Sequence, residues 1–200
     1  PEANPFLGWR AVRLSLDRPE LLRTQLAAIL RTAIDYPVQV LFPMISTVSE
    51  WRACREHLQR AAARLRERGL NPPEDIPVGI MVEVPAAALQ ASWFAAEADF
   101  FSIGTNDLAQ YTLAAERGNP RVAALSDALQ PAVLRLIDQV VRAAHARNKL
   151  AAVCGELAGE PLAVPLLVGL GVDELSMNMG AIPLVKHMIR ELDAASAEGL

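Results

Sequence analysis

Short apolar segments alternate with longer amphipathic segments along this chain of 200 residues. The short segments predict five strands, at residues 38–42, 76–82, 100–103, 151–154 and 174–177, and a further short strand at residues 12–14. These segments lack a regular alternation of apolar and polar residues, which indicates parallel strands covered on both faces. Strand–helix alternation of this kind predicts an α/β fold.

Several of the helices between these strands carry local signals in the sequence. Asp17 with Glu20, and Thr47 with Glu50, have the spacing of a capping box, so a helix is expected to begin at each pair. Pro165, inside the segment EPLAVPLLVGLG, is expected to kink or shorten the helix that contains it.

Two α/β architectures fit this order of elements. One is a doubly wound sheet with helices on both faces, and the other is a (β/α)8 barrel; both place functional residues at the carboxyl ends of strands. The sequence shows no internal linker, so residues 1–200 are expected to belong to one domain. Because the chain begins at Pro1 rather than methionine, we expect it to be a fragment of a longer protein.

Composition narrows the class of protein. The net charge is −4 and the basic residues are scattered, which disfavours a nucleic-acid partner. The longest apolar run, residues 162–172, is too short and too interrupted to cross a membrane. Two cysteines, Cys54 and Cys154, do not form a disulfide framework, which favours a reducing compartment and therefore the cytoplasm.

Polar residues follow four of the predicted strands. Glu83 follows the second strand, Asn106 and Asp107 follow the third, Cys154 closes the fourth, and Asn178 follows the fifth. Glu83 and Asp107 lie about one strand-plus-helix unit apart, so their carboxylates are expected at the ends of neighbouring strands.

This pattern indicates an anionic ligand and a cation. Two adjacent carboxylates repel each other unless one is protonated or a cation lies between them. Mg²⁺ or Mn²⁺ with oxygen ligands satisfies that requirement, and a general acid–base pair is the other chemical interpretation. Arg117, together with Asn106, could bind a phosphorylated or carboxylated substrate through its guanidinium group.

Each of these residues also has a purely structural interpretation. Asn106 and Asp107 could cap the next helix. Cys54 and Cys154 could be core residues, since free cysteine is often buried, and Cys54 lies on the apolar face of a predicted helix. Arg117 could be a surface residue beside a turn. The spacing alone leaves these alternatives open.

Four segments resemble a known family. NPFLGWRAVR (4–13), MVEVPAAA (81–88), FFSIGTNDLAQYTLAAERGN (100–119) and CGELAG (154–159) occur in this order. Together they resemble the C-terminal, phosphoenolpyruvate-binding domain of enzyme I of the bacterial sugar phosphotransferase system. Pyruvate phosphate dikinase and phosphoenolpyruvate synthase share this architecture and some of the motifs, so a domain of either enzyme is an alternative. A non-catalytic dimerisation or regulatory module is a second alternative.

The resemblance implies a (β/α)8 barrel that binds phosphoenolpyruvate and Mg²⁺, and it assigns roles to residues at the strand ends. Glu83 and Asp107 would be Mg²⁺ ligands. Asn106 and Arg117, with Arg10, would hold the phosphoryl group, and Asp107 would also contact the substrate. With six strand candidates in this chain, the barrel would be incomplete.

The resemblance also implies a reaction and partners. Cys154 would deliver a proton to the enolate carbon, which gives pyruvate. The phosphoryl group would pass to a histidine in an N-terminal phosphohistidine domain of the longer protein and then to the phosphocarrier HPr, to drive sugar uptake. Because this chain lacks that histidine domain, we expect it not to complete turnover alone. A homodimer is expected as well.

Overall fold

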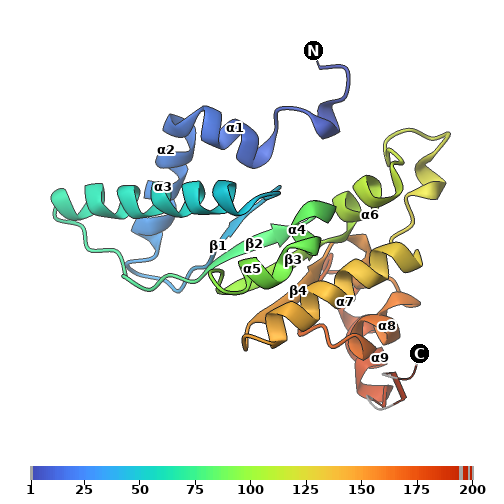
Figure 1. The fold of residues 1–200 in the computed structure, drawn as a ribbon. Coiled ribbons are helices and arrows are strands. Elements are labelled where there is room, and N and C mark those ends of the chain that lie inside the picture. Colours follow the sequence, from blue (N-terminus) through green and yellow to red (C-terminus); the bar gives the residue numbers. More distant parts are fainter. Residues whose placement is uncertain (1, 194–195, 198, 200) are drawn as a thin grey trace.

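A computed structural model describes residues 2–193, 196–197 and 199 of the chain (Figure 1). Its core is a sheet of five parallel strands that follow each other in chain order. They are β1 (Val40–Phe42), β2 (Val78–Val82), β3 (Phe100–Gly104), β4 (Leu150–Cys154) and β5 (Glu174–Ser176). The prediction of an α/β fold with a parallel sheet is confirmed, and all five of these strands lie at predicted positions.

The predicted strand at residues 12–14 is wrong, because this segment belongs to helix α1 (Ala11–Asp17). Val12 is buried, and Leu16, four residues later on the same helical face, packs against the core. A three-residue apolar segment fits both a strand and one turn of helix. The packing of α1 on α2 (Pro19–Thr32) and α3 (Val48–Glu67) decides between them.

Of the two helix starts that capping-box spacing predicts, one is confirmed and one is wrong. Thr47 and Glu50 form the predicted capping box at the start of α3, with each side chain bonded to the other residue's backbone N–H. The predicted start at Asp17 is wrong: Asp17 ends α1, and α2 begins at Pro19, which needs no N–H donor at this position.

Most of the other helices are short, and α7 and α9 are the longest of them. Pro165 lies in the first turn of α8, where proline is tolerated, so α8 is short rather than kinked. The remaining helical elements are η1 (Pro5–Leu7), α4 (Pro85–Leu89), α5 (Ala91–Phe94), α6 (Thr105–Leu113), η2 (Ala123–Leu125), α7 (Pro131–His145), η3 (Glu156–Gly159), α8 (Ala163–Gly169) and α9 (Ile182–Glu191). Within the described part of the chain, no helix is long and apolar enough to cross a membrane.

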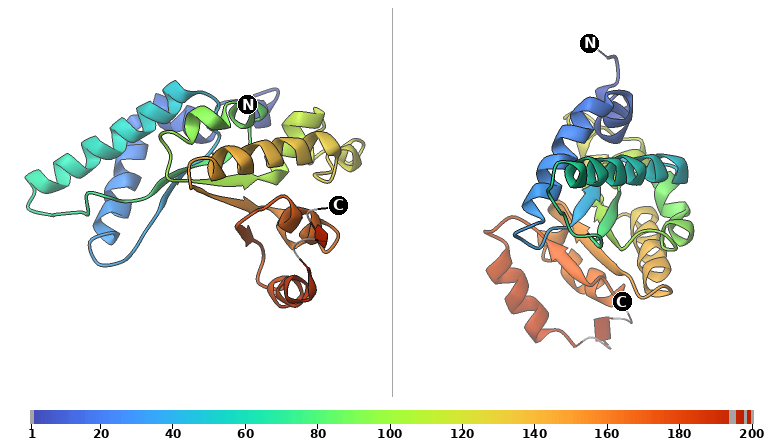
Figure 2. Two further views of the ribbon diagram at one scale, coloured as in Figure 1. Left: turned by 60° about the horizontal axis from the view of Figure 1, so that its bottom comes forward. Right: turned by 90° about the vertical axis from the view of Figure 1, so that its left-hand side faces the viewer.

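The two faces of the sheet differ. Parallel strands that follow each other in chain order, with right-handed crossovers, place the connecting helices on one face. Both views of Figure 2 show α3, α5 and α7 on the same side of the strands. Strand residues beneath these helices are fully buried, as Ile80, Phe101 and Val153 illustrate. The opposite face carries Met81 and Cys154, which stay partly exposed.

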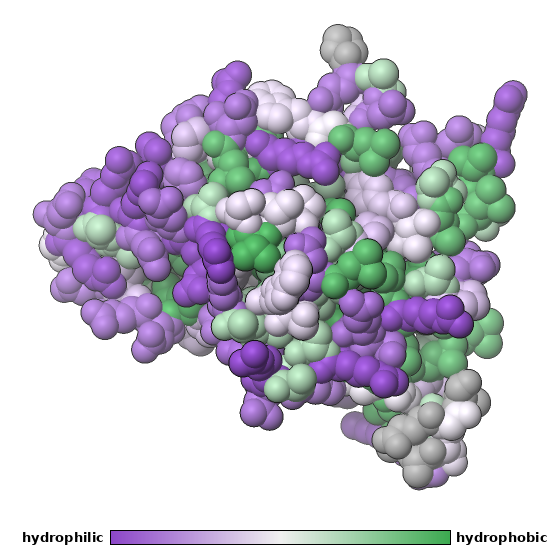
Figure 3. Space-filling model, viewed as in Figure 1, coloured by the Kyte–Doolittle hydropathy of each residue, from purple (hydrophilic) through white to green (hydrophobic). Residues whose placement is uncertain are grey.

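Helix α3 shows how the outer surface is built. Trp51, Cys54 and Leu58 belong to its buried face, while charged residues cover its opposite face. In Figure 3 the corresponding end of the molecule, on the left, is predominantly hydrophilic. This amphipathic pattern is typical of a helix that packs on a sheet with one face in water. Buried polar residues, in contrast, lie at the carboxyl ends of the strands, where Glu83 and Asp107 follow β2 and β3.

Candidate functional site

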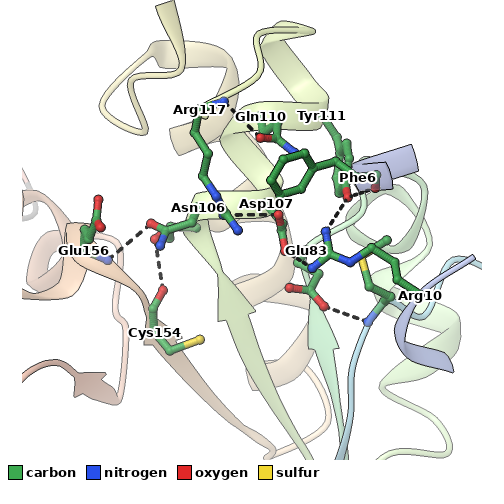
Figure 4. A network of polar contacts seen from close by, with 12 residues as sticks. Phe6, Arg10, Glu83, Asn106, Asp107, Gln110, Tyr111, Arg117, Cys154 and Glu156 are labelled. Atoms are coloured by element: carbon green, nitrogen blue, oxygen red, sulfur yellow. Dashed lines mark hydrogen bonds and ion pairs between the residues drawn. The ribbon is translucent and has the colours of Figure 1, made fainter. Parts of the chain in front are cut away.

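A network of polar side chains lies at the carboxyl ends of β2, β3 and β4 (Figure 4). Glu83 directly follows β2, Asp107 lies in the first turn of α6 directly after β3, and Cys154 ends β4. The N-terminal segment crosses this edge and adds Arg10, which contacts Asp107. Arg117 reaches Asp107 from the loop after α6. The structure therefore brings the predicted site residues into one region.

Glu83 and Asp107 are buried beside each other, with 5% and 6% of their surfaces exposed. The backbone N–H of Met44 donates to Glu83 Oε1 at 2.7 Å. Gly104, at the end of β3, leaves space for the other oxygen, since an added Cβ would lie 3.0 Å from Glu83 Oε2. Burial raises the pKa of Glu83 to about 7, and the negative charge of Asp107 adds to this rise, while the Met44 N–H opposes it.

Two guanidinium groups neutralise Asp107. Arg10 Nη2 donates to Asp107 Oδ2 at 3.3 Å, and Arg117 Nη1 lies 3.1 Å from Asp107 Oδ1. The second contact is an ion pair but not a hydrogen bond: Oδ1 is buried, and no donor is aligned with it. One buried carboxylate thus holds two cations that come from positions far apart in the sequence.

Phe6 and Tyr111 complete this part of the network, and sequence reasoning assigned no role to either. The ring centroid of Phe6 lies 5.5 Å from the guanidinium carbons of both Arg10 and Arg117. Tyr111 Oη donates to the Phe6 carbonyl and accepts a hydrogen bond from Arg10 Nη1 at 3.2 Å. Phe6 lies in the segment NPFLGWR, which could have pointed to it, whereas no local signal pairs Tyr111 with the N-terminal segment.

Arg117 is also held through its backbone. Its N–H donates to Gln110 Oε1 at 3.0 Å, and Gln110 is buried in α6.

The structural interpretation of Asn106 and Asp107 as helix caps is wrong, because α6 begins at Thr105 and no side chain caps it. Both side chains take part in the network instead of capping the helix.

Cys154 is positioned by residues of β3 and α6. Ser102 Oγ donates to Cys154 Sγ at 3.4 Å, and Thr105 Oγ1 donates to the Cys154 carbonyl at 2.9 Å. Burial raises the pKa of the Cys154 thiol, and the Ser102 hydrogen bond acts in the opposite direction. The thiol is therefore protonated at neutral pH, and it is half-buried rather than part of the core. Cys54, in contrast, is fully buried, as its core interpretation requires.

The turn after Cys154 requires glycine. Gly155 has φ of +104°, and a Cβ there would lie 2.8 Å from Thr105 Oγ1. The next residue, Glu156, donates its backbone N–H to Asn106 Oδ1 at 3.3 Å. These contacts lock the end of β4 against the start of α6, which sets the position of the thiol relative to Asn106.

The residues present fit a magnesium ion. Glu83 and Asp107 offer carboxylate oxygens only, and the described residues contain no group of three or more His, Cys, Asp or Glu side chains suited to a metal. Mg²⁺ commonly uses one or two protein carboxylates and takes its other ligands from water and phosphate. Asp107 Oδ1 is buried, has no hydrogen-bond partner and already lies beside a cation, the Arg117 guanidinium, so its surroundings suit a positive charge.

Two cavities differ in their chemistry. One of about 490 Å³ lies beside the network and is lined by Phe6, Met44, Val84 and Tyr111 among others. A larger one, of about 590 Å³, lies at the amino ends of the strands. Asp99 in its lining is exposed, and it already accepts a hydrogen bond from the Val78 N–H at 2.8 Å, which is a structural role. The chemistry therefore points to the carboxyl ends.

Comparisons with known proteins show the family to which this chain belongs. A family model described as the PEP-binding domain of PEP-utilising enzymes matches residues 1–194. The chain is 49% identical over 197 residues to a phosphoenolpyruvate-protein phosphotransferase of Priestia megaterium, covering 98% of this chain and 34% of that protein. It is 47% identical over 199 residues to the one of Staphylococcus carnosus, covering 100% and 35%. The chain thus spans about a third of these relatives.

A solved structure shares the fold. The citrate lyase of Burkholderia xenovorans LB400 aligns with a TM-score of 0.61 at 21% identity, covering 83% of this chain and 53% of that one. At this level of identity the likeness concerns the α/β fold.

Proposed function

This chain belongs to the family of PEP-binding domains of PEP-utilising enzymes, and from that premise we propose that it binds phosphoenolpyruvate as part of a phosphoenolpyruvate-protein phosphotransferase. The observation that carries this proposal is the convergence of Arg10 and Arg117 on Asp107, beside a second buried carboxylate and close to a protonated thiol. The relatives of this name cover the whole chain, which favours them over a dikinase or synthase.

The arginines would bind the phosphoryl group. Phosphoenolpyruvate carries about three negative charges, so cations placed in advance stabilise it and the transition state of transfer. The guanidinium groups of Arg10 and Arg117 offer several N–H donors in a planar arrangement that suits phosphate oxygens. Asn106, half-buried between Asp107 and Cys154, would donate a further hydrogen bond.

Glu83 and Asp107 would hold Mg²⁺, with water and substrate oxygens as further ligands. The bound ion would supply positive charge that neutralises the phosphoryl oxygens during transfer. Asp107 would exchange its contacts with the arginines for the ion, which frees both guanidinium groups for the substrate.

Cys154 would act as the acid. When the bond between phosphorus and the enol oxygen breaks, the phosphoryl group passes to a histidine nitrogen of the longer protein. The enolate that remains takes the thiol proton at its methylene carbon, which gives pyruvate. The raised pKa of Cys154 keeps this proton available at neutral pH.

The proposal extends to architecture and partners. Parallel strands in unbroken chain order support a (β/α)8 barrel, since a doubly wound sheet reverses its strand order. Residues 1–200 would form one part of that barrel, because the described residues contribute five of the eight strands that it needs. We further propose that the longer protein forms a homodimer in the cytoplasm, and passes the phosphoryl group through its phosphohistidine domain to HPr.

Calorimetry tests the proposal on the longest natural protein that contains this chain. Phosphoenolpyruvate should bind in the presence of Mg²⁺ and more weakly with a chelator. Asp107→Ala should abolish the Mg²⁺ dependence, while Asp35→Ala, which removes an exposed carboxylate after α2, should bind as the unchanged protein does. Mg²⁺-dependent binding by the Asp107→Ala variant that matches the binding by the unchanged protein would refute the assignment.

A further inference from the structure

The ring of Phe6 contacts Arg10 and Arg117, which lie 107 positions apart in the sequence. The distance from the ring centroid to the guanidinium carbon is 5.5 Å for both arginines. Phe6 is half-buried and lies in the short helix η1 rather than in the apolar core. Its carbonyl accepts the hydroxyl of Tyr111, so α6 fixes the backbone that carries the ring. Figure 4 shows the ring next to Asp107, with both guanidinium groups directed to the same point.

An aromatic ring holds a guanidinium group differently from a carboxylate. Asp107 attracts the two arginines by its negative charge, and it therefore competes with any anion that approaches them. The face of a phenyl ring attracts a cation through its quadrupole and carries no net charge. A guanidinium group held by Phe6 keeps its full positive charge for an anionic ligand.

The two anchors also differ in what happens to them in the proposed cycle. When Asp107 binds a cation, it would lose its contacts with the two arginines. Its negative charge would then no longer offset the repulsion between Arg10 and Arg117. The side chain of Phe6 has no ligand atom for the cation, so its contacts with the arginines would not be exchanged for the ion. The ring remains available to hold both guanidinium groups near each other.

We propose that Phe6 is a positioning residue that keeps Arg10 and Arg117 at the phosphoryl-binding position when Asp107 is engaged elsewhere. This inference rests on the proposed function, and it makes the ring a determinant of affinity for phosphorylated ligands. Phe6→Leu removes the ring and keeps an apolar side chain, whereas Phe6→Tyr keeps the ring. Leu7→Ala is the matched control, since Leu7 is the next residue of η1 and is exposed.

A first experiment needs no ligand. Phenylglyoxal modification of the longest natural protein containing this chain, followed by peptide mapping, reports how freely each arginine moves. In Phe6→Leu the rate at Arg10 and Arg117 should rise about threefold or more, because two cation–π contacts are lost. Arg142, paired with Asp138 on α7, should not change. Phe6→Tyr and Leu7→Ala should behave as the unchanged protein.

The increase should be larger in an Asp107→Asn background, in which the ring still contacts both guanidinium groups and Tyr111 still bonds to Arg10. Rates at Arg10 and Arg117 that are the same with and without the ring would overturn the inference, whether or not the protein binds phosphoenolpyruvate. An increase at Arg142 as well would also overturn it, because that result indicates general loosening of the fold.

A second experiment measures the ligand. Phosphoenolpyruvate with Mg²⁺ should bind Phe6→Leu about 5- to 30-fold more weakly, from two cation–π contacts, and Phe6→Tyr should restore the affinity. The effect should shrink to less than about twofold when Arg10 and Arg117 are both replaced by methionine, since Phe6 would act through them. Equal affinity of Phe6→Leu and the unchanged protein contradicts the inference, whereas failure of the unchanged protein to bind contradicts the proposed function.

Discussion

Glu83 and Asp107 lie next to each other at the ends of neighbouring strands, and both carboxyl groups are buried. Asp107 also holds two arginines, so positive charge lies on its side of the pair, while burial raises the pKa of Glu83. This asymmetry leads to the first prediction.

The free energy of unfolding should fall as pH rises from about 4.5 to 7 when a chelator removes metal ions. The pKa of Glu83 is about 7 in the folded protein against 4.5 for the unperturbed group, so the folded state binds more protons in this window. The contribution is up to about 3 kcal/mol, since each pKa unit corresponds to about 1.4 kcal/mol. Urea unfolding at several pH values measures it.

Glu83→Gln should remove this part of the pH dependence, because glutamine does not titrate. Glu74→Gln, at an exposed loop position, is the control and should leave the slope unchanged. A Glu83→Gln protein with the same slope as the unchanged protein would show that Glu83 ionises normally.

Iodoacetamide should modify Cys154 and spare Cys54 in the folded protein. Cys154 is half-buried, whereas Cys54 is fully buried in α3 and burial raises its pKa to about 12. Mass spectrometry should find a single rapid modification in native protein and two after denaturation. Cys154→Ser should abolish the rapid reaction, and rapid labelling of Cys54 would contradict the burial of α3 against the sheet.

Ser102→Ala should slow the alkylation of Cys154. The Ser102 hydroxyl donates to Cys154 Sγ and lowers the pKa of this thiol, so its removal leaves less thiolate at a given pH. A lost hydrogen bond of about 1 kcal/mol corresponds to roughly a fivefold slower reaction at pH 8. Ser92→Ala, at an exposed position, is the control. An unchanged rate in Ser102→Ala would mean that the hydroxyl does not bond to the sulfur in solution.

Gly155→Ala should destabilise the protein by roughly 1–3 kcal/mol. The φ of +104° disfavours a side chain, and the new Cβ would displace Thr105 from the Cys154 carbonyl. Gly118→Ala is the matched control: its nearest atoms lie 3.7 and 3.9 Å away, so its effect should stay within about 0.5 kcal/mol. Denaturant unfolding compares the two, and equal stabilities would argue against the strained turn.

Much of the fold could be predicted because its signals are local. Apolar segments of strand length located β1 to β5, and the pair Thr47 and Glu50 located the start of α3. The adjacency of Glu83 and Asp107 could also be predicted, because parallel strands in chain order bring their carboxyl ends to one edge. The roles of these residues remain predictions.

The sequence by itself determined which residues stand at the strand ends, since this follows from periodicity and spacing along the chain. Only the tertiary structure decided that residues 12–14 form a helix and that Phe6 joins two arginines. It also decided that Glu83 and Asp107 differ in their charge environment. Contacts between residues a hundred positions apart leave no periodic trace in the sequence, and burial, which sets a pKa, exists only once the chain has folded.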